Sequence, residues 1–511
     1  MFDLGRTLLA SVERNPQSPA IVDGEVRLTY AQWLDRIERV AGALASLGLA
    51  RGDHLVTALA NRFEAATLHW ACQMLGVIIT PLNWRATSDD IDYCLHDADA
   101  RAIAYEELTA AAVRGAPLAG SVVRIAVGDA PADTGAHVFA AMLDAAPHGS
   151  GPMAQADDTS VMLYTSGTTG RPKGVPRRHR QERAAAVAHV AQNFYARGEV
   201  TLGVMPLYHT MGVRSLLAMA LVDGCFACLP RFDAARALAI IEAARVSNLY
   251  LVPTLYHDLL SHPRFAATNV SSVRKLGFAG APMSDGLLAR VDAAFRPELF
   301  VNHYGSSEIY TFTIEPNAAA KPGSAGKAGI NQRIRVVKLA ARSPDDIAVV
   351  REEGQIIADV TSDEAFDGYW RRPEADAKAI RDGWYFSGDT GYVDARGDLF
   401  VTGRVDDMII SGGENISPVD IESVLSLHAG VDEVAVAGLP DERWGQRVVA
   451  FVKRKASIDG EALDAHCRAS QLANYKRPRE YVFVREIPKS PVGKILRRKL
   501  VAGEYQREPN T

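Results

Sequence analysis

The sequence is poor in cysteine, in long apolar runs and in positive charge. Its five cysteines are scattered along 511 residues, a pattern typical of reduced thiols, so we expect a cytoplasmic protein. The longest apolar region, residues 215–230, is interrupted by Asp223 and Gly224, and such a broken run is too short to span a bilayer. The net charge of -5 argues against nucleic acid or an anionic membrane as the main partner.

Cys225 and Cys228 form a lone C-x-x-C pair, the arrangement that would suggest a metal site. A structural zinc site needs a second pair of ligands, and the sequence offers no second C-x-x-C. The pair also lies inside an apolar run, so we expect both thiols to be small buried side chains.

The length of the chain exceeds what one hydrophobic core supports, so we expect one large and one smaller domain. Across about the first 400 residues, apolar runs rich in valine and isoleucine alternate with helical patterns, which predicts an α/β fold with mostly parallel, buried strands. Thr29 and Gln32 form a capping box before a helix that ends near Gly48. The expected strands are residues 55–59, 77–80, 161–164, 249–252, 276–279 and 299–302.

A domain boundary is expected near residues 403–407, after a strand at 398–402. Beyond it, Ser417 to Asp420 is predicted to cap a helix, with strands expected at 431–438, 448–453 and 481–484. We therefore expect domains at residues 1–403 and 404–511, the second a small α+β unit. The Gly-, Ala- and Lys-rich segment 318–329 is predicted to be a loop. The cations Arg497, Arg498 and Lys499 are interpreted as a solvated basic face.

The strongest chemical signal is the run 164–174, Tyr-Thr-Ser-Gly-Thr-Thr-Gly-Arg-Pro-Lys-Gly, which follows an apolar strand. Its glycines allow the backbone to approach an anion, its hydroxyls donate hydrogen bonds and Lys173 adds positive charge. It is not a Walker A loop, because no Gly-Lys-Ser/Thr is present in it. A flexible linker would not need the preceding strand, so the run predicts a polyphosphate site.

This run resembles the phosphate loop of the adenylate-forming superfamily, which includes acyl-CoA synthetases, peptide-synthetase adenylation domains and luciferases. Further motifs of that superfamily follow in its order, at residues 302–308, 384–389, 403–407, 411–416 and 488–494. The resemblance covers nearly the whole chain. The amino-acid sequences of residues 403–422 and around Trp444 are most similar to those of bacterial aryl-CoA ligases of the 4-chlorobenzoate type.

The resemblance implies a large N-terminal domain of stacked mixed sheets with helices and a small barrel-like subdomain. A small, mobile α+β C-terminal domain would turn about a hinge near Asp406. It also implies a two-step reaction, in which ATP activates a carboxylic acid as an acyl-adenylate and coenzyme A then accepts the acyl group. Two anions meet in the first step, so the site needs cations that neutralise them.

The resemblance assigns roles to individual residues. Glu308 would hold Mg²⁺ against the phosphates, Lys494 would be the catalytic lysine that bridges the carboxylate and the α-phosphate, and His209 would be a wall or gate of the acid pocket. Taken alone, Glu308 is equally a surface glutamate and His209 a structural histidine in a turn. The residues expected to contact ATP are Thr165, Ser166, Gly167, Thr168, Thr169, Gly170, Lys173, Gly280, Ala281, Pro282, Asn302, His303, Tyr304, Gly305, Ser306, Ser307, Asp389 and Arg404. Within this set, Tyr304 would face the adenine, and Asp389 and Arg404 would contact the ribose.

Coenzyme A is expected at residues of both domains. The loop Gly412, Gly413 and Glu414 would line a tunnel for pantetheine. Arg85, Trp444, Lys476 and Arg477 are candidates for the nucleotide end, although a surface cation or a packed tryptophan explains each of them as well.

The acid pocket is expected to be lined by His209, Met211, Tyr250, Ala281, His303, Tyr310 and Thr311. Most of these residues are aromatic or bulky. His303, Tyr310 and Thr311 make the pocket more polar than a halobenzoate requires, and buried polar atoms need partners. We therefore expect a small aromatic or heteroaromatic acid, of the benzoate, hydroxybenzoate, chlorobenzoate or furoate type.

Several alternatives remain open at this point. The protein could be a medium-chain fatty acyl-CoA synthetase, or a stand-alone adenylation enzyme that loads a carrier protein. A luciferase-like oxygenase has no specific support, and a non-catalytic nucleotide sensor would not need Lys494, Glu308 and Asp389 together. A monomer or a homodimer is expected.

Overall fold

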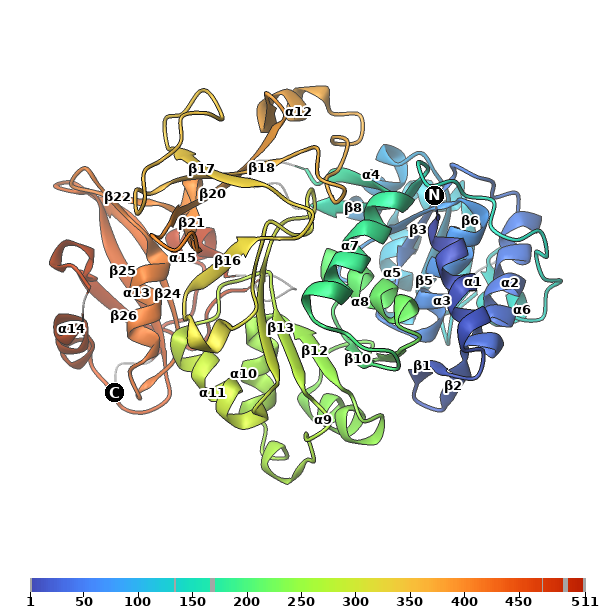
Figure 1. Ribbon diagram of the computed structural model, residues 1–511, viewed down its shortest axis with the longest axis horizontal. Helices are drawn as coiled ribbons and strands as arrows, with labels where there is room; N and C mark the ends of the chain where they lie inside the picture. Colours follow the sequence, from blue (N-terminus) through green and yellow to red (C-terminus); the bar gives the residue numbers. More distant parts are fainter. Residues whose placement is uncertain (1, 133–134, 166–170, 471, 490–494, 509–511) are drawn as a thin grey trace.

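The computed structural model describes residues 2–132, 135–165, 171–470, 472–489 and 495–508. Figure 1 shows two sheets with helices between them and a smaller unit at the C-terminal end of the chain. The first sheet is parallel except for its last strand. Its order is β7 (His137–Val138), β6 (Val123–Val127), β5 (Ala100–Glu106), β3 (His54–Ala58), β4 (Ile78–Pro81), β8 (Thr159–Thr165) and β9 (Lys173–Arg178).

The second sheet is longer and changes character along its length. Its parallel half, extended by two antiparallel strands, has the order β2 (Val26–Thr29), β1 (Pro19–Asp23), β11 (Cys225–Cys228), β10 (Val200–Gly203), β12 (Asn248–Leu251), β13 (Lys275–Phe278), β14 (Leu299–Tyr304) and β15 (Thr313–Glu315). It continues as an antiparallel subdomain with β16 (Ser324–Ala328), β21 (Leu399–Arg404), β20 (Trp384–Val393), β18 (Gly354–Asp359) and β17 (Ile334–Lys338), and β19 (Ile380–Arg381) pairs with β20.

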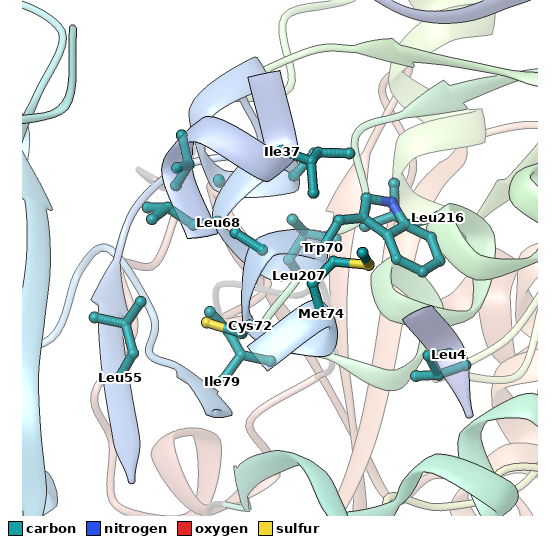
Figure 2. Packing of buried hydrophobic residues seen from close by; sticks show 14 of the residues in the cluster. Leu4, Ile37, Leu55, Leu68, Trp70, Cys72, Met74, Ile79, Leu207 and Leu216 are labelled. Carbon is teal, nitrogen blue, oxygen red and sulfur yellow. The ribbon is translucent and has the colours of Figure 1, made fainter. Parts of the chain in front are cut away.

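The helices between the two sheets contain the largest core. These are α1 (Leu4–Arg14), α3 (Phe63–Leu75), α7 (His179–Gln192) and α8 (Thr210–Leu221), and α2 (Tyr30–Ser46) packs on α3. Helix α3 is buried at every residue except Glu64, and its polar residues Thr67, His69 and Gln73 are buried among the apolar ones. Figure 2 shows its Cys72 beside Ile79 of β4, while its Trp70 ring points away from Ile79 on the other side of the helix.

Further helices cover the outer faces of the sheets. The first sheet is covered by α4 (Ser88–Asp97), α5 (Glu107–Gly115) and η1 (Pro117–Gly120), with α6 (Phe139–Met142) at its edge. The second is covered by α9 (Ala234–Ala243), α10 (Pro253–Ser261), η2 (Phe265–Ala267) and α11 (Asp285–Phe295), and α12 (Pro373–Ala379) lies beside β19.

The C-terminal unit is built on a mixed sheet in the order β23 (Glu414–Ile416), β22 (Ile409–Ser411), β25 (Gly445–Arg454) and β24 (Val431–Asp441), with β26 (Glu480–Phe483) beside β25. Its helices are α13 (Pro418–Ser426), α14 (Gly460–Ala469) and α15 (Arg497–Val501), and η5 (Asn474–Lys476) precedes β26. An α/β main part with an antiparallel subdomain and an α+β C-terminal unit is the predicted fold class, which is confirmed.

Local predictions agree with this fold at most positions. The strands expected from apolar runs correspond to β3, β4, β8, β12, β13 and β14. The capping box is present, since the Gln32 amide donates to Thr29 Oγ1 at 3.3 Å and the Thr29 amide to Gln32 Oε1 at 3.0 Å. Cys225 and Cys228 are free and buried, as expected. Within the described part of the chain, no helix is long and apolar enough to cross a membrane.

The expectation of a loop at residues 318–329 is wrong. The segment contains η3 (Ala318–Ala320) and the strand β16, which pairs with β15 and β21. Glycine marks close strand packing in this segment. A Cβ on Gly326, whose φ is 77°, would lie 2.0 Å from the Ile314 carbonyl oxygen.

Two expectations in the C-terminal unit also need correction. Helix α13 begins after Ser417, but the Ser417 hydroxyl donates to the Thr402 carbonyl of β21 and makes no cap hydrogen bond. Arg497 does not belong to a solvated face, because α15 packs against β24 and turns this residue inward. Its guanidinium binds both Glu422 oxygens, at 2.7 and 2.8 Å.

Candidate active site

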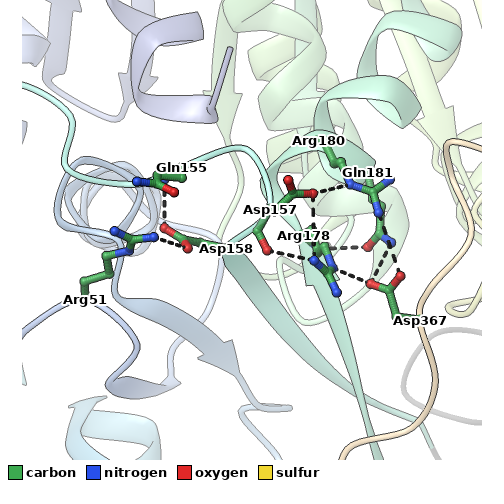
Figure 3. Close-up of polar contacts among 8 residues, drawn as sticks. All are labelled: Arg51, Gln155, Asp157, Asp158, Arg178, Arg180, Gln181 and Asp367. Carbon is green, nitrogen blue, oxygen red and sulfur yellow. Dashed lines mark hydrogen bonds and ion pairs between the residues drawn. The ribbon is translucent and has the colours of Figure 1, made fainter. Parts of the chain in front are cut away.

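The hairpin β8–β9 positions the predicted phosphate loop. Thr165 at the end of β8 pairs with Lys173 at the start of β9. Ser166, Gly167, Thr168, Thr169 and Gly170 lie outside the described residues. At the opposite end of β9, Arg178 Nε donates to Asp367 at 2.5 Å, as Figure 3 shows.

Lys173 lies in the same cluster as the predicted metal ligand, Glu308. The Lys173 ammonium stacks over the ring of Tyr369 at 3.9 Å from its centroid, and the Tyr369 hydroxyl donates to Glu308 Oε1 at 2.7 Å. Burial and the nearby Glu308 carboxylate raise the pKa of Tyr369, so the phenol stays protonated as a donor. The Glu308 carbonyl also accepts from Arg177 at 3.0 Å. Sequence motifs missed Tyr369, which lies far from Glu308 along the chain.

The arrangement around Glu308 fits a magnesium ion that binds together with phosphates. Such ions take one or two protein carboxylates and complete their shell with substrate oxygens and water. Among the described residues, no group of three or more His, Cys, Asp and Glu side chains could hold a metal by itself. Glu308 would hold the ion, which when bound neutralises phosphate charge.

A second cluster contains the three residues predicted to contact the nucleoside. The Tyr304 hydroxyl donates to Asp389 Oδ2 at 2.6 Å, and Arg404 donates to Asp389 Oδ1 at 2.8 Å. Asp389 of β20 and Arg404 of β21 are direct partners in the sheet. Burial, followed by the Asp389 charge, raises the pKa of Tyr304. A row of aromatic contacts joins this cluster to Tyr369 through Phe312, Tyr385 and Phe366.

The remaining ATP candidates follow the carboxyl ends of two neighbouring parallel strands. Gly280, Ala281 and Pro282 come after β13, and Gly305, Ser306 and Ser307 come after β14. Ligands bind at this edge of parallel sheets. Gly305 is required there, since a Cβ would lie 2.2 Å from the Tyr310 carbonyl oxygen. Asn302 supports the edge by donating from Nδ2 to the Ser324 carbonyl at 2.8 Å.

The predicted acid pocket divides into a buried group and a peripheral one. The rings of Tyr250 and His303 meet edge to face at 4.9 Å, and Met211 packs in the same core as Tyr250. Tyr310 and Thr311 are also buried. His209 precedes α8, with its ring 5.0 Å from that of Tyr208, and Ala281 is half-buried.

Three further residues belong to this buried group, and no sequence motif pointed to them. His189 of α7 lies 4.7 Å from the Tyr250 ring and 5.2 Å from the His303 ring. Asn193 bridges the two histidines: its Nδ2 lies 3.0 Å from His189 Nδ1, and its Oδ1 lies 3.0 Å from His303 Nε2. Arg214 of α8 donates to the Tyr310 carbonyl at 2.6 Å.

The coenzyme A candidates do not form one group. The Gly412 amide donates to the Trp444 carbonyl at 2.8 Å, and Glu414 begins β23 after Gly413. The Trp444 ring, which a Cβ on Gly412 would meet at 2.7 Å, lies beneath the cations of Arg443 and Arg479. The other candidates bind elsewhere. Lys476 pairs with Asp420 and Arg477 with Asp464, each at 2.6 Å, and exposed Arg85 stacks on Trp84.

Two predicted residues cannot be placed by their side chains. Asp406 lies in η4 (Val405–Asp407) between β21 and β22, but its side chain is outside the described part. Lys494 lies outside the described residues altogether. Nearby, Lys489 and Ile495 form a β-bridge, and Lys489 binds Glu433 of β24.

Two known protein families match most of this chain. Residues 8–370 match the AMP-binding enzyme family, and residues 420–494 match the AMP-binding enzyme C-terminal domain. The chain belongs to the AMP-binding enzyme family. As a member of it, the chain is 33% identical over 495 residues to a 4-chlorobenzoate–CoA ligase from Arthrobacter sp., covering 96% of this chain and 93% of that protein.

Other relatives in the family differ in the acids that they are named for. A long-chain-fatty-acid–CoA ligase of Mycobacterium tuberculosis is 32% identical over 508 residues and 97% of each chain. The crystal structure of an anthranilate CoA ligase in complex with anthranoyl-AMP matches with a TM-score of 0.91 at 26% identity, covering 98% of this chain and 97% of that one. The family and the class of AMP-forming acid–thiol ligase that the motifs predicted are thereby confirmed.

Proposed function

We propose that the protein is an ATP-dependent carboxylate–CoA ligase for a small aromatic or heteroaromatic acid. The observation that carries this proposal is the connection of two polar clusters by a row of aromatic side chains. Lys173, Tyr369 and Glu308 form a site for polyphosphate, while Tyr304 and Asp389 form a site for a nucleoside. The aromatic side chains between them are buried in one core cluster, which holds the two clusters in a fixed relation.

The first half-reaction forms the acyl-adenylate. An oxygen of the carboxylate attacks the α-phosphorus of ATP, and the bond to pyrophosphate breaks. Charge repulsion opposes this approach, so cations at the site lower the barrier. Lys173 and a magnesium ion on Glu308 would neutralise the negative charge of the departing pyrophosphate. Lys494 would neutralise the charge of the carboxylate and the α-phosphate as the new bond forms.

The second half-reaction transfers the acyl group. The thiolate sulfur of coenzyme A attacks the acyl carbon and AMP leaves. Support for this acceptor comes from the relatives named as CoA ligases and from the Gly412–Trp444 contact, which sets an exposed aromatic ring and two arginines beside the predicted pantetheine loop. We further propose domains at residues 1–403 and 404–511 with the hinge at Asp406, and a monomer or homodimer in the cytoplasm.

Exchange of labelled pyrophosphate into ATP over a panel of carboxylic acids tests acid activation. Benzoate, 4-hydroxybenzoate, 2-furoate and anthranilate should support exchange, and octanoate should support it poorly. Faster exchange with octanoate or longer acids than with every aromatic acid would favour the fatty acyl alternative, which the mycobacterial relative represents. Thioester formation with free coenzyme A then separates a CoA ligase from an enzyme that loads a carrier protein.

The division of labour between the half-reactions has its own test. Lys494→Ala should nearly abolish pyrophosphate exchange, yet it should leave thioester formation from supplied acyl-adenylate intact, because the positive charge is needed only while the two anions approach. An equal loss in both assays would contradict this role for Lys494.

A further inference from the structure

Arg214 is a buried cation whose guanidinium is only partly used by the protein. The side chain is 2% exposed and comes from α8, whose other residues are mostly apolar. One nitrogen donates to the Tyr310 carbonyl at 2.6 Å. The described residues give Nε and Nη1 no hydrogen-bond partner. A buried charge without partners is costly, so these two nitrogens indicate that a ligand supplies the missing acceptor.

Arg177, the neighbouring buried arginine, differs from Arg214 in having a counter-ion. It is fully buried, and its Nε binds Glu182 at 2.8 Å. Its Nη1 donates to two backbone carbonyls, so that among the described residues only Nη2 lacks a partner. Arg214 forms no ion pair among the described residues, and the Glu364 carboxyl group interacts with it only through space.

A hydrogen-bonded chain of two histidines lies beside Arg214. Asn193 Nδ2 donates to the His189 carbonyl at 2.7 Å, which fixes the orientation of the Asn193 amide. The same nitrogen lies 3.0 Å from His189 Nδ1, which must therefore accept. Asn193 Oδ1 lies 3.0 Å from His303 Nε2, which must therefore donate.

These bonds set the tautomer of each ring. Burial and the Arg214 charge lower the pKa of His303, and burial and His303 lower that of His189, so both rings are neutral. The proton of His189 is then on Nε2, and Nδ1 of His303 carries a lone pair. Both of these atoms are buried and unpartnered in the described structure. The group therefore presents an N–H donor and an acceptor in addition to the Arg214 donors.

The position of this group relates it to the acid. His303 is the neighbour of Tyr304 on β14, and successive side chains of a strand point to opposite faces. Tyr304 binds the nucleoside cluster, so His303 lies across the sheet edge from it, among residues of the predicted acid pocket.

We propose that Arg214 and the His189–Asn193–His303 chain determine specificity by binding a hydrogen-bond acceptor in or on the ring of the substrate acid. This proposal rests on the proposed function and specifies its substrate class. The acids selected are heteroaromatic or hydroxylated ones, in which a ring oxygen, ring nitrogen or hydroxyl receives an Arg214 N–H. Hydroxyl groups would also use the His303 lone pair.

Pyrophosphate exchange on matched acids tests the proposal. The wild-type enzyme should show a kcat/KM for 4-hydroxybenzoate or 2-furoate at least about tenfold above that for benzoate or cyclopentanecarboxylate. The rings of the latter two acids carry no hydrogen-bond acceptor and therefore leave Arg214 unpaired. Arg214→Met should lower kcat/KM for the acceptor-bearing acids by roughly 10- to 100-fold and change that for benzoate less than about threefold. Arg214→Lys should restore part of the preference.

Arg183→Met is a matched control, since Arg183 lies on α7, the helix of His189, but contacts Thr7 and Phe2. It should leave the preference unchanged. Equal losses for all acids in Arg214→Met would mean that Arg214 is structural and would overturn the proposal. If that variant does not fold, the wild-type ratio decides alone, and a ratio near one refutes the selection. If none of the acids supports exchange, the proposed function is refuted instead. If a dicarboxylic acid is preferred, the group that Arg214 binds is an anion, and the proposal of a neutral acceptor is overturned.

Discussion

Replacing Glu182 with glutamine should strongly destabilise the folded protein, although Glu182 lies outside the predicted ATP site. Glu182 and Arg177 are both fully buried, with Arg177 Nε 2.8 Å from Glu182 Oε1. Glutamine keeps an acceptor but leaves the Arg177 charge uncompensated in the interior. Breaking a buried pair by removing one partner costs about 3–5 kcal/mol, and we expect the lower end because one hydrogen bond survives.

Arg177→Met should cost more, about 5 kcal/mol, because Glu182 loses its partner and the carbonyls of Glu308 and Glu364 lose a donor. The double variant Arg177→Met/Glu182→Leu removes both charges of the pair, so it should lose only about 2 kcal/mol for the two carbonyls. The strong non-additivity is the signature of a coupled pair.

Urea denaturation followed by far-ultraviolet circular dichroism measures these differences. Arg178→Met is the control, because that adjacent arginine forms exposed ion pairs worth less than about 1 kcal/mol. Wild-type stability in Glu182→Gln, or a double variant as unstable as the sum of the single ones, would refute the reasoning. The double variant, although folded, should exchange pyrophosphate more slowly than the wild type, because the Glu308 carbonyl loses its hydrogen bond from Arg177.

Two further predictions concern the nucleoside cluster and the contact between the two parts of the chain. Tyr304→Phe removes the 2.6 Å bond to Asp389 and should raise the KM for ATP about tenfold in the exchange assay; an unchanged KM would mean that Asp389 does not need this donor. His257 of α10 contacts Asp432 of β24 at 2.9 Å, and Asp258 and Asp432 raise its pKa above the ordinary 6.5. The stabilisation is therefore complete below pH 6.5 and is lost as the pH rises through the folded-state pKa, so His257→Gln should lower the melting temperature at pH 6 but little at pH 9, and equal effects at both would contradict it.

The sequence predicted best those features that depend on short segments. Apolar runs located β8 and β14, and the Thr29 capping box marked the start of α2, because each signal is complete within a few residues. The loop expected at 318–329 failed for the opposite reason. Glycines that allow β16 to lie against β15 look, in sequence alone, like glycines of a turn.

The missed residues share a different cause. Tyr369 reaches Glu308, and Arg214 reaches Tyr310, only after strands distant in the chain pair. A single arginine in an apolar helix has no partner that sequence patterns reveal. Arg497 misled in the same way, since its inward orientation depends on how α15 packs on β24.

The alternation of side chains along β14 bears on how such an enzyme changes its substrate. Tyr304 and His303 are adjacent in the chain, yet one serves the nucleoside cluster and the other the buried histidine chain. Substitution at residue 303 alters the acid side while the backbone of residue 304 stays in place. New acids are thus accessible by single replacements on one face of a strand whose other face keeps the shared nucleotide chemistry intact, whereas a one-residue shift of that strand would exchange the two faces and destroy both.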